Sequence, residues 1–110
     1  MENPNLADEV SRLHADICSA LADPNRIMLI YALAEKPCNV NELAAQVGIS
    51  QPTASRHLKI LRERGLATPL RQGANVEYRL ADRRIVDALD LLRAILRDRI
   101  AYRASIMDNE

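Results

Sequence analysis

Residues 41–67 read NELAAQVGISQPTASRHLKILRERGLA, and this stretch decides the fold class. Asn39 and Glu42 have the spacing of a capping box, in which the glutamate side chain bonds back to the residue that caps the helix. Gly48 suits the left-handed position that ends a helix, and Ser50 suits the cap of the helix that follows. Two short helices joined by a brief turn that contains glycine predict a helix-turn-helix.

The second helix of this pair has an apolar stripe and a polar outer face. Ala54, Leu58 and Leu61 share one stripe, which we expect to pack against the preceding helix. The remaining side chains are small, polar or basic. Glutamine can pair with an adenine edge and arginine with a guanine edge in the major groove. Basic side chains further along the helix suit contacts to phosphates. The sequence therefore predicts that this helix contacts double-stranded DNA through Gln51, Thr53, Ser55, Arg56, Lys59 and Arg62.

The segments before and after this motif have patterns of their own. Apolar residues recur in steps of three and four over about residues 6–21, which predicts an amphipathic helix. Asp23 and Pro24 then suit the start of a buried helix that ends near Ala34, and EKPCN after it suggests a loop. Residues 66–80 contain two short runs on either side of the turn RQGAN, and apolar and charged residues alternate from Val76 to Leu80. This pattern predicts a β-hairpin, or wing.

Residues 83–107 contain neither glycine nor proline and predict one long helix of roughly 40 Å at 1.5 Å per residue. Neither this helix nor the first can bury its apolar stripe within so small a monomer. We therefore expect a homodimer whose interface is built from Leu6, Val10, Leu13, Ile85, Leu89, Leu92 and Leu96.

The formal net charge of zero conceals an uneven distribution. Residues 50–84 carry eight bases and three acids, a net charge of +5, while residues 1–49 carry −4 and residues 85–110 carry −1. A basic middle between acidic ends indicates a local anionic partner, although chance clustering on a solvated face would give the same counts. The predicted wing tip, with Arg71, Gln72 and Asn75, would then reach phosphates or the minor groove.

Length and composition exclude several other classes of protein. A chain of 110 residues fits a single domain, here residues 1–110, with the helix-turn-helix at about 39–64. No apolar run approaches the roughly 18 residues of a membrane span, and the first residues lack a secretory segment, so we expect a cytoplasmic protein. The sequence contains no glycine-rich phosphate loop and no arrangement of nucleophile and base, which argues against an enzyme.

Two alternatives to DNA binding are open at this point. The predicted second helix of the motif could be a solvated helix of a bundle. It could also belong to a winged-helix module that binds another protein, which would require an acidic or apolar outer face. Arg56, Lys59 and Arg62 argue against the second alternative.

Three stretches, ALADPNRIMLIYAL, NELAAQVGISQPTASRHLKILRERGLA and QGANVEYRL, resemble the ArsR/SmtB family of winged-helix transcriptional repressors. The similarity covers roughly residues 15–80, with the motifs in order. It implies a mainly α fold with a small β-hairpin and a homodimer formed by the first and last helices. It also implies an inverted-repeat operator and release by a metal or another signal, although a regulator without any inducer is the alternative.

The sequence departs from the sensor motifs of this family. The arsenic and cadmium type has CVC where this chain has NVN at residues 39–41, and the last helix lacks the histidines of the zinc type. The cysteine positions of the persulfide type are also not matched.

Cys18 and Cys38 are then the only thiols. We expect Cys18 to be a small buried residue and Cys38 to be exposed in its loop. Together they could bind a thiophilic metal or metalloid across the dimer, with His14 as a third ligand, or become oxidised; both could equally be inert. His57 is expected to pack or to bond locally rather than to bind metal.

Overall fold

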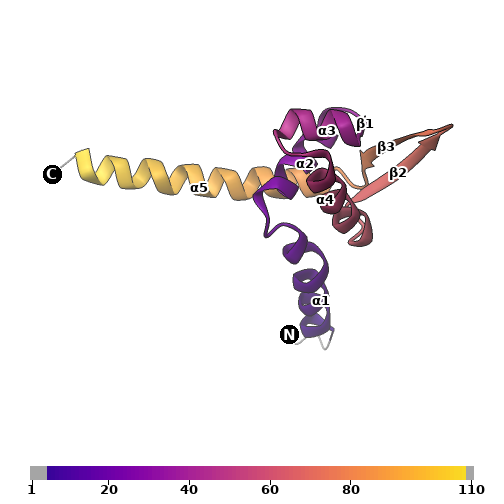
Figure 1. Ribbon diagram of the computed structural model, residues 1–110. Helices are drawn as coiled ribbons and strands as arrows, with labels where there is room; N and C mark the ends of the chain where they lie inside the picture. Colours follow the sequence, from indigo (N-terminus) through magenta and orange to yellow (C-terminus); the bar gives the residue numbers. More distant parts are fainter. Residues whose placement is uncertain (1–4, 109–110) are drawn as a thin grey trace.

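The computed structural model describes residues 5–108 and has the predicted fold class, mainly α with a β-hairpin (Figure 1). The outermost residues of the predicted domain 1–110 lie outside the described residues. In chain order the elements are α1 (Leu6–Arg12), the π-helical segment η1 (Leu13–Cys18), α2 (Pro24–Glu35), β1 (Cys38–Asn39), α3 (Val40–Val47), α4 (Gln51–Glu63), β2 (Ala67–Gln72), β3 (Asn75–Leu80) and α5 (Arg84–Asp108).

The predicted caps begin and end the helices of the motif. Asn39 and Glu42 form the capping box, with the Glu42 amide 2.8 Å from Asn39 Oδ1 and the Asn39 amide 2.9 Å from Glu42 Oε1. Gly48 ends α3 with a φ of 78°, a conformation that a side chain would strain. Ser50 caps α4 by accepting a bond from the amide of Thr53 at 3.3 Å. The helix-turn-helix prediction is therefore confirmed.

An aliphatic core lies between α2, α3, α4 and the first turns of α5. Leu29 and Ile30 of α2, Leu43 of α3 and Leu58 of α4 are fully buried within it. The stripe predicted for α4 faces this core, since Ala54 and Leu61 are also fully buried. Core packing thus fixes which face of α4 remains outside.

The wing is part of a three-stranded antiparallel sheet in the order β1-β3-β2. Residues 35–39 were expected to form a loop, but Cys38 and Asn39 form β1 and pair with β3, so that Cys38 lies opposite Tyr78. The expectation that Cys38 is exposed is therefore wrong, because this pairing places its side chain in the core at 0% exposure. A strand of two residues is too short to show the alternation that identifies strands in a sequence.

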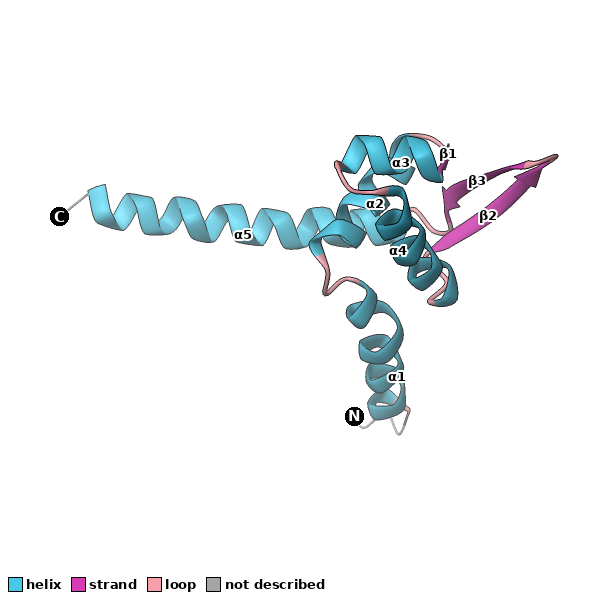
Figure 2. Ribbon diagram, viewed as in Figure 1, coloured by secondary structure: helices cyan, strands magenta, loops and turns pink. Residues whose placement is uncertain are grey.

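The N-terminal helix and the far part of α5 project from this body in different directions (Figures 1 and 2). The first helix continues through the π-helical segment into Ser19 and Ala20, one residue short of the predicted range 6–21. None of the helices in residues 5–108 is long and apolar enough to span a membrane.

The projecting parts carry most of the residues predicted for the dimer interface. Five of them are 47–58% exposed in the protomer, namely Leu6, Val10, Leu13, Leu92 and Leu96. The prediction for Leu89 is wrong as a free interface residue, because it is only 5% exposed and belongs to the core of its own protomer. Ile85 is half-buried against the same core.

Candidate nucleic-acid interface

The outer face of α4 is polar and accessible. Its predicted contact residues are exposed except for Thr53, which is half-buried. The Thr53 hydroxyl accepts a hydrogen bond from Ser50 Oγ at 2.8 Å, so this residue also serves the start of the helix. Lys59 Nζ lies 4.0 Å from Glu63 Oε1, but both side chains are more than half exposed and can separate at little cost. The exposed members of the set are Gln51, Ser55, Arg56, Lys59 and Arg62.

The basic residues of segment 50–84 fall into two groups according to their partners. Arg64 pairs with Asp16 at 3.4 Å, and Arg84 pairs with Asp82 at 2.7 Å. The Arg84 guanidinium holds the pKa of Asp82 at about 2, well below its usual range. Within residues 5–108, the members of this segment without an ion pair are Arg56, Arg62, Arg71, Arg79 and Arg83. Because guanidinium groups without an ion pair are the ones available to phosphates, the free positive charge lies on α4, the wing and the turn before α5.

The register of the wing separates its predicted tip residues. Gln72 lies opposite Asn75, and Thr68 lies opposite Arg79, so these four side chains share one face of the hairpin. Arg71 points to the other face, because side chains alternate along a strand. Arg79 was not among the predicted contacts, although its even spacing from Asn75 along the strand would have placed it on the same face.

The two cysteines have the opposite exposures to those expected. Cys18 is exposed, whereas Cys38 is buried. The Cys38 thiol donates to the carbonyl of Lys36 at 3.4 Å and accepts from Gln46 Nε2 at 3.7 Å. Burial raises the pKa of Cys38, so its thiol stays protonated and reacts slowly.

The residues proposed for a metal do not assemble within one protomer. No group of three or more His, Cys, Asp and Glu side chains in residues 5–108 is placed to hold a metal ion. His14 is exposed on the N-terminal helix, and Cys38 is enclosed in the core. To share a metal with Cys18 across a dimer, Cys38 would first have to leave the core.

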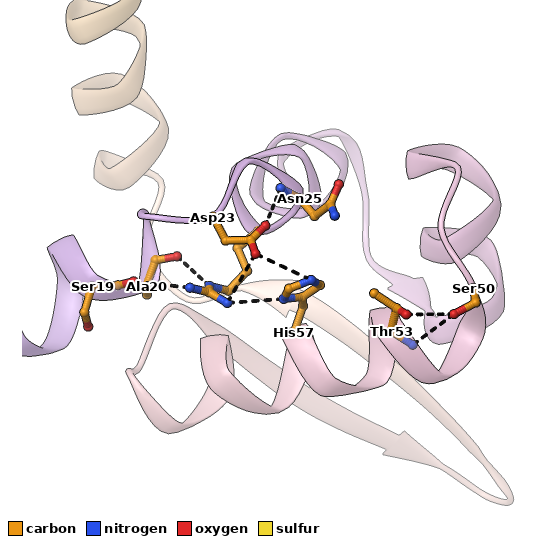
Figure 3. A network of polar contacts seen from close by, with 8 residues as sticks. Ser19, Ala20, Asp23, Asn25, Ser50, Thr53 and His57 are labelled. Atoms are coloured by element: carbon orange, nitrogen blue, oxygen red, sulfur yellow. Dashed lines mark hydrogen bonds and ion pairs between the residues drawn. The ribbon is translucent and has the colours of Figure 1, made fainter.

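His57 lies on the buried side of α4 and is 5% exposed. Its Nδ1 is 3.2 Å from Arg26 Nη1, and its Nε2 is 3.9 Å from Asp23 Oδ2 (Figure 3). The expectation that His57 packs is confirmed, but its polar contacts are to Arg26 and Asp23, which lie far from it in the sequence.

Comparison with known proteins identifies the family of this chain. Residues 23–68 match the bacterial regulatory proteins of the arsR family. The biofilm growth-associated repressor of Agrobacterium fabrum is 38% identical over 81 residues, which are 74% of this chain and 69% of that protein. The solved structure of the cadmium metal sensor CmtR from Mycobacterium tuberculosis is 38% identical, with a TM-score of 0.61 over 71% of this chain and 81% of its own.

A homodimeric winged helix-turn-helix DNA-binding domain from Mycobacterium bovis has the same fold, with a TM-score of 0.77 over 92% of this chain and 93% of its own. Its identity to this chain is 24%, so the likeness concerns the fold. On the sequence matches, the chain belongs to the ArsR family of bacterial regulatory proteins, and it is a DNA-binding transcriptional repressor rather than an enzyme.

Proposed function

We propose that α4 is the recognition helix of a homodimer that represses transcription in the cytoplasm by binding an inverted-repeat operator. The observation that carries this proposal is the outer face of α4. It has small polar side chains and arginines without an ion pair, and the opposite face of the helix is a buried apolar stripe. Small side chains in the first turns let the helix backbone approach the base edges. Gln51 and Arg56 would contact bases in the major groove.

The basic side chains outside the first turns of α4 have a different role in this proposal. Arg62 and Lys59 lie further along the helix and would bind phosphates, as would Arg71 and Arg79 on the wing. Such contacts raise affinity for any duplex and fix the orientation of the protein without selecting a sequence. Gln72 and Asn75 at the wing tip would bond to phosphate or sugar in the adjacent minor groove.

The N-terminal helix and α5 supply the dimer interface in this proposal. Their apolar side chains are exposed in the protomer, and a two-fold dimer would place two copies of α4 in successive major grooves. Operators of such dimers are palindromic because the protein is symmetric.

The placement of the base contacts can be tested with matched arginine variants. A duplex selected by the wild-type protein from a random library serves as the operator, and fluorescence anisotropy measures binding to it and to a scrambled duplex. Arg56→Ala should cost about 1–3 kcal/mol on the operator and less on the scrambled duplex. Arg97→Ala on the exposed part of α5 removes the same charge elsewhere and should leave the preference unchanged. Unaltered operator affinity in a folded variant with both Gln51→Ala and Arg56→Ala contradicts the proposal.

We propose further that any inducer response is thiol-based and runs through Cys18. The last helix lacks histidine, and carboxylates alone hold zinc weakly beside better ligands. Cys38 is enclosed, whereas Cys18 is exposed on the helix assigned to the dimer interface. Modification of Cys18 would therefore act where the two protomers meet.

The test of this response compares Cys18→Ser with Cys38→Ser in operator release by arsenite, cadmium, zinc and a disulfide oxidant. Release should be lost in Cys18→Ser and retained in Cys38→Ser. Equal responses of Cys18→Ser and wild type, or no response of wild type to any agent, would show that the sensor lies elsewhere or does not exist.

A further inference from the structure

One guanidinium joins three elements of the fold. Arg26, in the first turn of α2, donates from Nε to the carbonyl of Ala20 at 2.7 Å and from Nη2 to the carbonyl of Ser19 at 3.3 Å. Its Nη1 contacts His57 Nδ1 of α4 (Figure 3). Ser19 and Ala20 end the N-terminal helix, whose last carbonyls lack partners within the helix. A single side chain thus ties the end of that helix to the middle of α4.

The chemistry of the groups fixes the direction of each bond. Arginine carries only donors, so His57 Nδ1 must be the acceptor, and the neutral ring then carries its proton on Nε2. That nitrogen faces Asp23 Oδ2. The Asn25 amide at 2.8 Å is the main reason why the pKa of Asp23 is lowered, so Asp23 is an anion. The imidazole therefore lies with its acceptor toward a cation and its donor toward an anion.

This arrangement adds a directional restraint to the core packing that already sets which face of α4 is buried. The leucines of the stripe pack through non-directional contacts, which tolerate small sliding, whereas a charge-assisted hydrogen bond requires its distance and angle. His57 is adjacent in sequence to Arg56, about 100° from it around the helix, and one side chain is buried while the other is exposed. Any rotation of α4 that moves His57 also moves Arg56.

We infer that Arg26 and His57 are positioning residues for DNA recognition, which set α4 relative to the helix that ends at Ala20. The inference rests on the proposed function of α4. In the proposed dimer, the contact between Arg26 and His57 lies between each recognition helix and the dimer interface. If this contact is lost, the distance between the two copies of α4 varies more widely. Half-sites stand about 34–36 Å apart, and base contacts depend on this spacing more than contacts to the continuous phosphate backbone do.

Three variants separate the hydrogen bond from packing and charge. His57→Asn retains an acceptor close to the position of Nδ1, and His57→Leu removes it while keeping a side chain of similar size. Arg26→Lys keeps the charge but loses the fork that reaches both Ala20 and His57. Each is assayed for affinity to the selected operator and to the scrambled duplex, for dimer mass and for thermal unfolding.

The ratio of operator to scrambled affinity should fall about tenfold in His57→Leu, the size expected for a residue that touches no DNA but changes how α4 is positioned. His57→Asn should recover most of this ratio, and Arg26→Lys should lose it. The double variant with Arg26→Lys and His57→Leu should be no worse than Arg26→Lys alone, because Arg26→Lys already removes the contact to His57. Dimer mass should not change.

Arg56→Ala, measured beside these variants, distinguishes the two levels of the proposal. If Arg56→Ala lowers the ratio and the folded variants at Arg26 and His57 do not, the positioning role is wrong while the function of α4 stands. If Arg56→Ala has no effect, the function of α4 fails, and the inference fails with it. A His57→Asn protein as impaired as His57→Leu also overturns the inference, because ring volume rather than the acceptor would then matter. If His57→Leu does not fold, the comparison of the operator-to-scrambled ratio between Arg26→Lys and His57→Asn decides: the ratio should be lost in the first and kept in the second.

Discussion

Truncating Leu89 and Leu92 to alanine should separate the core of the protomer from the dimer interface. The two residues lie three positions apart on α5, yet Leu89 is 5% exposed and Leu92 is 58% exposed. Leu89→Ala removes core packing and should lower the free energy of unfolding by about 2–5 kcal/mol. Leu92→Ala leaves the isolated protomer almost unchanged, because most of that side chain is already in contact with solvent.

The effect of Leu92→Ala on the dimer follows from its exposure. Complete burial of a leucine side chain is worth about 1.5–3 kcal/mol, so burying the exposed part contributes roughly 1–1.7 kcal/mol. A two-fold interface contains two copies, which gives about 2–3.5 kcal/mol per dimer. The dimer dissociation constant should therefore rise by a factor of about 30–400.

Sedimentation equilibrium measures this constant, and urea unfolding of both variants measures the stability of the protomer. Leu92→Glu should go further and yield monomers, since an unpaired carboxylate is costly to bury. Two results would refute the reasoning. One is a Leu92→Ala protein with the wild-type dissociation constant. The other is a Leu89→Ala protein that dissociates without any loss of protomer stability, which would place Leu89 in the interface after all.

Three further predictions concern the wing, the thiols and pH. Arg79→Ala removes two contacts from a dimer, so it should weaken binding to every duplex and reduce the slope of log affinity against log salt by about 2; an unchanged slope would remove Arg79 from the phosphate contacts. A chromogenic disulfide reagent should label Cys18 in the native protein and Cys38 only after unfolding. Cys18→Ser should therefore abolish the rapid phase of labelling, and rapid labelling of that variant would contradict the burial of Cys38. Because Asp82 has a folded pKa of about 2 against an ordinary value of 3.8, its contribution to stability is complete above the ordinary value and is lost as the pH falls toward 2. Thermal unfolding of Asp82→Asn between pH 2 and 6 should show a shallower decline on acidification than wild type, and equal declines would mean that the bond to Arg84 does not act in solution.

The helix-turn-helix could be predicted from the sequence because its signals are local. The capping box joins Asn39 and Glu42, and the cap of α4 joins Ser50 and Thr53, each within one turn of chain. The residue types and spacing therefore contain the whole interaction. The side chains on the outer face of α4 could be predicted in the same way, since helical periodicity assigns every side chain to a face.

Features that depend on distant partners could not be predicted in this way. The burial of Cys38 requires a strand partner, Tyr78, on the far side of the helix-turn-helix. The contact between Arg26 and His57 spans 31 positions, and neither residue type indicates burial. Sequence periodicity placed Leu89 on the apolar side of α5, but it could not show that the protomer's own core ends between Leu89 and Leu92.

The far part of α5 is apolar over more than one stripe, and this bears on how the dimer is built. At about 100° per residue, Leu92, Leu96 and Ile100 form one stripe, and Leu91 and Ile95 belong to a second stripe beside it, continued by Tyr102 and Ile106. Together these span about half of the helix circumference, and all are at least 43% exposed. A single antiparallel contact between two copies of α5 covers a narrower seam than this. The second stripe therefore calls for another apolar helix, and the exposed side of the N-terminal helix, with leucine and valine at matching spacing, meets that need. A dimer in which each α5 packs against both the α5 and the N-terminal helix of its partner would cover all of these side chains. It would also place the end of the N-terminal helix, where Arg26 holds the carbonyls, directly between the interface and α4.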